Sequence, residues 1–164
     1  MQWPPDKKQP EERMNREKIG LFVVRIALGV FFIFEGWDKL PWMTHPELLA
    51  AILQRWAAAG VPIGKWYIDT LLISGVSVTA RLVFLGEVAA GLAFLCGFWT
   101  RTAAIFTFLM VLNIHIAHSS IFRYGFLSKG DGLPILGGLL ALAIAGRDLP
   151  FSLSSRSGRS RKRE

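Results

Sequence analysis

The chain has 164 residues, enough for one domain, and 52% of them are hydrophobic while 19% are charged, below the share of about 25% that is usual in soluble domains. Its formal net charge is +7, and most charges lie before residue 19, after residue 146 or at junctions between long apolar runs. This segregation is typical of a membrane protein and argues against nucleic-acid binding, because basic residues that flank apolar segments are expected from the positive-inside rule.

The first apolar segment covers residues 19–40 and follows a charged stretch at residues 1–18. A helix needs about 20 apolar residues to cross the hydrocarbon core, so this segment predicts a membrane span. It has no A-x-A cleavage site after it, and we expect it to be retained. Arg25 lies inside the span, and such a charge is costly enough to mark a candidate functional position.

Residues 41–80 form a long connection before the next span. Thr44 and Glu47 have the spacing of a capping box, which predicts the start of a helix. An apolar stripe follows and predicts an amphipathic helix on the membrane surface or over the mouth of the bundle; it comprises Leu48, Leu49, Ile52, Leu53 and Trp56. Several aromatic residues here fit an interfacial belt, namely Trp42, Trp56, Trp66 and Tyr67. Residues 68–80 could extend the second span or dip into the membrane.

Three further apolar segments cover residues 82–99, 102–119 and 133–146. The second and third spans are joined only by Thr100-Arg101, which predicts a tight helical hairpin. Lipid offers no backbone hydrogen-bond partners and four segments cannot close a barrel, so all spans must be helical. The sequence therefore predicts an all-α fold: a four-helix transmembrane bundle with an amphipathic outer helix between spans one and two.

Small residues recur at the spacing of helix-packing faces; they are Gly86 with Ala90, Ala89 with Ala93 and Gly97, and Gly137 with Ala141 and Ala145. Cys96 is the single cysteine, which excludes an intrachain disulfide, and its apolar surroundings predict a small buried side chain.

An even number of spans places both termini on one side of the membrane. Basic residues are more numerous at the termini and at Arg101 than in the other connections, so both termini are predicted to be cytoplasmic. The basic tail at residues 154–164 is expected to contact anionic lipid.

This topology brings most ionisable groups to the outer third of the bundle. They are Glu35, Asp38 and Lys39 at the end of span one, Glu87 in span two, His115 and His118 in span three, and Asp131 before span four. Arg25 is the exception, because it lies about 15 Å deeper than Glu35 at the helical rise per residue.

Glu87 has two interpretations of similar weight. It could carry protons or contact a substrate headgroup, or it could form an interhelical ion pair with Arg25, Lys39 or a histidine. Arg25 is more simply structural, because a long basic side chain can pair or extend toward the interface.

His115 and His118 are three residues apart and would share a helix face. They could bind a metal or haem, protonate a quinone oxygen or form ordinary interfacial hydrogen bonds, but no partner at ligand spacing supports a metal site. Glu35, Asp38 and Lys39 could line a substrate mouth or form a solvated ion pair.

Several short motifs together resemble the DoxX family. Arg25-x-x-x-Gly29 followed by Glu35-Gly36-Trp37-Asp38-Lys39-Leu40 is similar to the family's opening signature. Gly86-Glu87 through Gly91 and then Gly97-Phe98-Trp99-Thr100-Arg101-Thr102-Ala103-Ala104 resembles its second block. The resemblance covers about residues 19–153. Ser154 stands where the family often has Asp, and Asp131-Gly132-Leu133-Pro134 replaces an Asn-rich entry to the last span.

The resemblance implies an integral protein of the plasma (inner) membrane, and some family members are small subunits of thiosulfate:quinone oxidoreductase. We therefore expect a subunit or accessory of a quinone-linked redox system, with quinone as the non-covalently bound group and a soluble or membrane oxidoreductase as partner. Glu87, His115 and His118 would handle protons, Lys39, Glu35 and Asp38 would bind substrate, and Arg25, Gly36 and Arg101 would be structural. Small-solute transport and the anchoring of a soluble redox enzyme are the alternatives.

Overall fold

The computed structural model describes residues 8–59, 62–121, 123–128 and 132–145. These residues form seven α-helices and one 3-10 helix, with no strand among them. In chain order the elements are α1 (Lys8–Asp38), η1 (Leu40–Met43), α2 (Glu47–Ala59), α3 (Pro62–Ser74), α4 (Val76–Cys96), α5 (Thr100–Ala117), α6 (Tyr124–Ser128) and α7 (Leu133–Ala145). The all-α prediction is confirmed for this part of the chain.

Three of the described helices are long and apolar enough to cross a membrane. They are residues Arg16–Asp38 of α1, all of α4 and all of α5. The fourth predicted span corresponds to α7, which is apolar but has only 13 residues, fewer than a helix needs to cross the hydrocarbon core.

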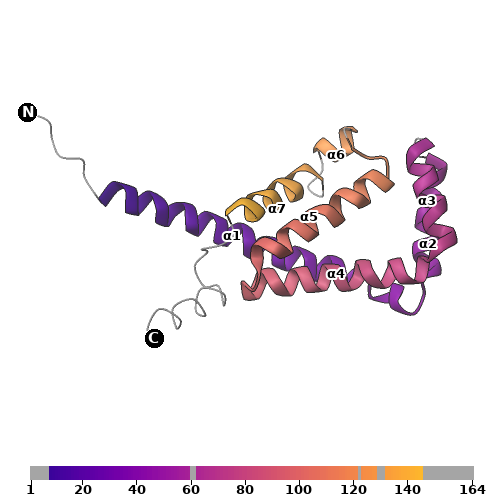
Figure 1. The fold of residues 1–164 in the computed structure, drawn as a ribbon, viewed down its shortest axis with the longest axis horizontal. Helices are drawn as coiled ribbons and strands as arrows, with labels where there is room; N and C mark the ends of the chain where they lie inside the picture. Colours follow the sequence, from indigo (N-terminus) through magenta and orange to yellow (C-terminus); the bar gives the residue numbers. More distant parts are fainter. Residues whose placement is uncertain (1–7, 60–61, 122, 129–131, 146–164) are drawn as a thin grey trace, which may run out of the picture.

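The four apolar helices contact one another in sequence around a shared core. α1 packs along α4, α4 contacts α5, α5 packs along α7, and α7 returns to α1 (Figure 1). Fully buried side chains of this core include Phe32, Phe94, Leu139 and Leu142. The helices α2 and α3 pack against each other and lie across the end of α4 and α5, at the opposite end of the molecule from the start of α1 (Figure 1).

The contact between α1 and α4 is close because glycines face the neighbouring helix. A Cβ atom added at Gly36 would lie 2.7 Å from Cγ2 of Val88, and one added at Gly91 would lie 2.9 Å from the backbone nitrogen of Ile33. Of the predicted small-residue faces, Gly86 does approach a neighbour, because a Cβ added there would lie 3.0 Å from Sδ of Met110, whereas one added at Gly137 would have no atom of the described residues within 4 Å. The close approach therefore depends on glycines other than the predicted Gly137 face.

The turn between α4 and α5 lies at residues 97–99, before the predicted Thr100-Arg101. Gly97 caps α4 in the left-handed region with a φ of 65°, and Trp99 precedes α5 with a φ of 47°. A glycine at this position ends a helix without a steric cost. Thr100 and Arg101 consequently belong to the first turn of α5, and the prediction of a tight connection is correct while its position was wrong.

The predicted capping box does not form, although the amphipathic helix does. The Oγ1 of Thr44 donates a hydrogen bond to the backbone oxygen of Pro41, because Thr44 ends the 3-10 helix η1 instead of starting α2. The Oε1 of Glu47 lies 2.8 Å from Nδ1 of His45. Further along, Gly75 separates α3 from α4 with a φ of 153°, so residues 76–80 extend the second span and residues 62–74 form a helix of their own.

The prediction that Cys96 is buried was wrong. Its side chain is exposed, because the buried residue in the last turn of α4 is Phe94, which points into the shared core. Other predictions concern residues outside the described part of the chain; these are residues 1–7, Asp131, the last-span exit at residues 151–154 and the basic tail at residues 154–164.

Candidate functional site

A cavity of about 290 Å³ lies between the ends of α1, α4 and α5 and the covering segment formed by η1, α2 and α3. This volume is close to the lower limit of about 300 Å³ for small-molecule pockets. Most of the lining is aliphatic or aromatic, including Phe31, Phe32, Leu49, Ile52, Leu53, Leu71, Val83 and Val111. The polar lining residues are few, as is usual for a pocket that orients a small ligand: Glu35, Lys39, Tyr67, Thr79, Glu87, Asn113 and His115.

Lys39 joins two carboxylates at one side of this cavity. Its Nζ lies 2.8 Å from Oε2 of Glu35 and 2.9 Å from Oε2 of Glu87, and it donates a further hydrogen bond of 3.2 Å to the backbone oxygen of Glu35. Glu35 is one helical turn before Lys39, so the first pair is local, whereas the second pair links the end of α1 to α4. The side chain of Glu87 is only 5% exposed and that of Lys39 16%, which places this ion pair out of bulk water.

Lys39 lies one residue beyond the apolar Arg16–Asp38 segment. Burial alone would lower the pKa of Lys39, but its hydrogen bonds to Glu35 and Glu87 and the charges of both carboxylates outweigh this effect and raise the pKa. The ammonium also lies 5.8 Å from the centre of the Trp42 ring, within the range of a cation–π contact. Lys39 is therefore a protonated, preoriented hydrogen-bond donor at the cavity wall.

His115 and His118 contact different partners. His115 lines the cavity, where Nδ1 lies 2.9 Å from Oγ of Ser120 and the ring packs edge-on against Phe126. The helix α5 ends at Ala117, so His118 is already its C-cap residue, and its exposed ring stacks on Trp56 with the centroids 4.8 Å apart. His118 is not among the described residues that line the cavity.

Comparison with known proteins identifies the family. The model of the DoxX family matches residues 20–119 of the chain. The chain belongs to the DoxX family. It is 35% identical over 132 residues to "Inner membrane protein YqjF" of Escherichia coli (strain K12), a match that covers 79% of the chain and 86% of that relative. No solved structure matches the chain.

The resemblance inferred from the motifs is thus confirmed, and this DoxX protein is a membrane protein with apolar transmembrane helices. The matched region contains Arg25, Gly36, Lys39, Glu87 and Arg101, which belong to the motifs on which the resemblance was based. The structure brings two of them, Lys39 and Glu87, into direct contact at the cavity. Of the basic partners considered for Glu87, namely Arg25, Lys39 and the histidines, the structure shows an ion pair with Lys39.

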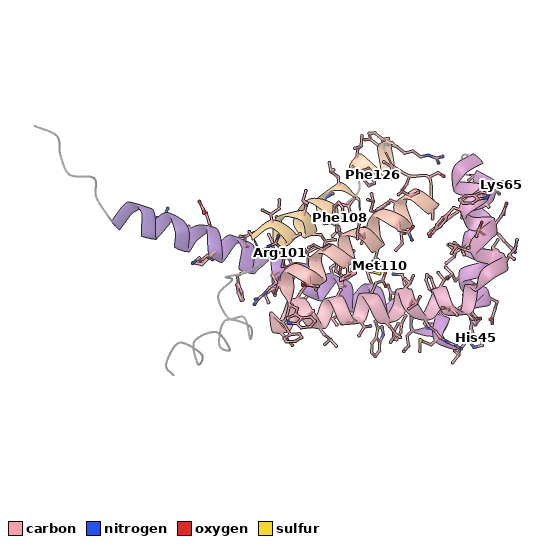
Figure 2. The ribbon with its side chains drawn as sticks, viewed as in Figure 1. His45, Lys65, Arg101, Phe108, Met110 and Phe126 are labelled. Carbon is pink, nitrogen blue, oxygen red and sulfur yellow. The ribbon has the colours of Figure 1, made fainter. Side chains whose placement is uncertain are left out.

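The other predicted residues of the DoxX protein lie away from the cavity. Arg25 is 1% exposed, and its guanidinium carbon lies 5.1 Å from the centre of the Phe22 ring, so it is buried and does not extend toward the interface. Arg101 is exposed at the start of α5, at the end of α4 and α5 that lies away from His45 and Lys65 (Figure 2). Asp38 is exposed and is not among the described lining residues, while Gly36 packs against Val88.

Within the described residues, no group of three or more His, Cys, Asp or Glu side chains could hold a metal ion. Trp42, Trp56 and Tyr67, which the sequence predicted as part of an interfacial belt, form aromatic walls of the cavity. Of that predicted belt, Trp66 is 69% exposed. Asn113 was missed, although a polar amide two residues before His115 in an apolar span is a signal that could have identified it.

Proposed function

We propose that this DoxX protein is a subunit or accessory of a quinone-linked redox system of the plasma (inner) membrane, similar to thiosulfate:quinone oxidoreductase. In this proposal α1, α4, α5 and α7 form a four-helix transmembrane bundle with both termini cytoplasmic, and the cavity receives a quinone headgroup. The observation that carries it is the protonated Lys39, held by two carboxylates at the wall of an aromatic cavity of about 290 Å³ between apolar helices.

The lining residues fit a quinone headgroup, which is a flat ring with carbonyl oxygens. Trp42, Trp56 and Tyr67 offer ring faces and edges for packing, and the aliphatic residues of α2 and α4 suit an apolar substituent. Lys39 can donate a hydrogen bond to a carbonyl oxygen, and its charge favours any negative charge that develops there. A bound quinone supplies the capacity to accept two electrons and two protons, and the electrons would come from a partner oxidoreductase.

Glu87 and His115 are two groups that can hold protons next to the cavity. Glu87 is buried against Lys39, and His115 is partly buried and positioned by Ser120. Carboxyl and imidazole groups are both common proton carriers in catalytic sites. The proposal thus gives Lys39 the role of binding and Glu87 and His115 the role of proton transfer.

A binding experiment tests the quinone site directly. The purified full chain in detergent is titrated with decylubiquinone while the fluorescence of its tryptophans is followed, because Trp42 and Trp56 line the cavity. We expect saturable quenching and a loss of affinity of about tenfold in Lys39→Met, which keeps the side-chain length but removes the charged donor. Lys65→Met is the matched control, because Lys65 is exposed on α3 and does not line the cavity.

Two results would contradict the quinone site: quenching that does not saturate, or saturable binding with equal affinity in Lys39→Met and Lys65→Met. If Lys39→Met does not fold, Val83→Phe tests the same cavity by filling it without removing a charge, and it should also abolish binding.

Transport and scaffolding predict different outcomes. A transport protein would show a solute flux in proteoliposomes that Glu87→Gln abolishes. A scaffold for a soluble redox enzyme would keep its function in Glu87→Gln and lose it when residues 156–164 or the helix α2 are deleted. Purification from membranes in mild detergent with identification of a bound oxidoreductase would favour the redox assignment over transport.

A further inference from the structure

The charges that line the cavity do not balance. Its titratable lining residues in the described part of the chain are Glu35 and Lys39 at the end of α1, Tyr67 on α3, Glu87 on α4 and His115 on α5. With neutral histidine and tyrosine, two carboxylates face one ammonium, which leaves one negative charge. Lys39 lies 2.8 Å from Oε2 of Glu35 and 2.9 Å from Oε2 of Glu87, so the excess negative charge is shared between a side chain that is 41% exposed and one that is 5% exposed.

An unbalanced charge in an apolar cavity is unfavourable unless a proton or a cation neutralises it. A ligand with one positive charge removes the imbalance, whereas an anion would double it. Charge complementarity therefore favours a monocation over a neutral molecule of the same shape.

The aromatic walls suit the same class of ligand. Trp42, Trp56 and Tyr67 line the cavity together with two phenylalanines, Phe31 and Phe32. Ring faces attract organic cations, and the attraction is strongest where water is excluded. Lys39 already demonstrates this property, because its ammonium lies 5.8 Å from the centre of the Trp42 ring. Trp56 is held in place by its stacking on His118, so this wall is formed before a ligand arrives.

We propose that the cavity binds a small organic monocation of the quaternary ammonium class, with Glu35 and Glu87 supplying the charge and Trp42 and Trp56 the aromatic walls. The ammonium of Lys39 competes with such a ligand for the same carboxylates. This site does not require that the cavity also binds quinone.

The test compares two probes that differ only in charge. Choline and its uncharged isostere 3,3-dimethylbutan-1-ol are titrated by calorimetry into the purified full chain in a non-ionic detergent. We expect choline to bind about tenfold more tightly than the alcohol, and Trp42→Leu to remove much of this preference. Equal affinity of the two probes, or no binding of choline, overturns the proposal.

Charge variants give effects of opposite sign that a general loss of structure would not produce. Glu35→Gln and Glu87→Gln should each lower the affinity for choline about tenfold, while Lys39→Gln should raise it by about threefold or more because a competing cation is removed. Glu47→Gln is the control, since Glu47 is exposed and does not line the cavity. If Lys39→Gln fails to fold, Glu35→Gln still tests the cation site, because the side chain of Glu35 is 41% exposed and its replacement should destabilise the protein less.

The two proposals for the cavity fail independently. Replacing Lys39 weakens quinone binding in one case and strengthens choline binding in the other. Unchanged choline affinity in Glu35→Gln, Glu87→Gln and Lys39→Gln would refute the cation site even if decylubiquinone still binds.

Discussion

The close approach of α1 and α4 at Gly91 gives a prediction whose size can be worked out from distances. In Gly91→Ala the new Cβ would lie 2.8 Å from Cγ1 of Ile33 and 2.9 Å from its backbone nitrogen. Ordinary contact begins at 3.4 Å, so the two helix backbones must separate by about half an ångström at this point. A gap of this size removes roughly a quarter to a half of the dispersion attraction of the atoms that face it.

Overpacking of this kind costs about 1–3 kcal/mol. Alanine also stabilises a helix interior by about 1 kcal/mol relative to glycine, so the net effect of Gly91→Ala is a loss of about 0–2 kcal/mol. Gly137→Ala is the matched control, because Gly137 lies inside α7 with no atom within 4 Å of a new Cβ. It should show the helix-propensity gain alone, and the difference between the two variants isolates the clash.

The measurement is thermal unfolding of both variants in the same detergent, followed by circular dichroism. We expect Gly91→Ala to melt about 2–12 °C below Gly137→Ala, which corresponds to the clash term for a chain of this size. Separation of α1 from α4 should also lengthen the Lys39–Glu87 ion pair and weaken binding in the cavity. Equal melting temperatures, or a Gly91→Ala variant that is the more stable of the two, would refute the close packing of α1 on α4.

Three further predictions concern the charged groups. A double-mutant cycle of Lys39→Met and Glu87→Gln, measured by unfolding in detergent, should give a coupling energy of about 1–3 kcal/mol, and additive effects would contradict the ion pair. The pKa of Lys39 is raised above its ordinary value of 10.5, so its contribution to stability is fully present below pH 10.5 and is lost as pH rises through the folded-state pKa. Lys39→Arg should therefore keep a higher melting temperature than the parent protein at strongly alkaline pH. Identical alkaline profiles of the two proteins would contradict a stabilising charge at Lys39. Glu47→Gln should leave the melting temperature at neutral pH unchanged, because Glu47 and His45 are both exposed and exposed ion pairs contribute little to stability. A clear drop in melting temperature would show that the start of α2 depends on this pair.

Much of the fold is predictable from the sequence because its signals are local. Long apolar windows identify α1, α4 and α5, and the stripe with Leu49 and Leu53 identifies the face of α2 that is buried. Antiparallel connections then place Glu35, Lys39, Glu87 and His115 at one end of the molecule, and all four do line one cavity.

Features that depend on a helix end or on rotation about a helix axis are not predictable in this way. His118 stacks on Trp56 of another helix while His115 lines the cavity, and their spacing along the chain does not reveal this difference in partners. The Thr44–Glu47 capping box is displaced by the 3-10 helix before it. Likewise, spacing alone does not distinguish Gly91, where an added Cβ would meet α1, from Gly137, where it would meet no described atom within 4 Å, because this depends on which way each helix is turned.

Lys39 also determines how any ligand can enter the site. Its ammonium has hydrogen-bond or ion-pair contacts with two oxygens of Glu35 and one of Glu87, and it lies at the end of α1, where the helix dipole favours a positive charge. A ligand that accepts a hydrogen bond from Lys39, or that replaces its charge, must displace one of these contacts. The side chain of Glu35 is 41% exposed and can be rehydrated when released, whereas that of Glu87 is 5% exposed and would be left buried. Glu35 is therefore the carboxylate that yields to a ligand, and Glu87 is the one that keeps Lys39 in the cavity.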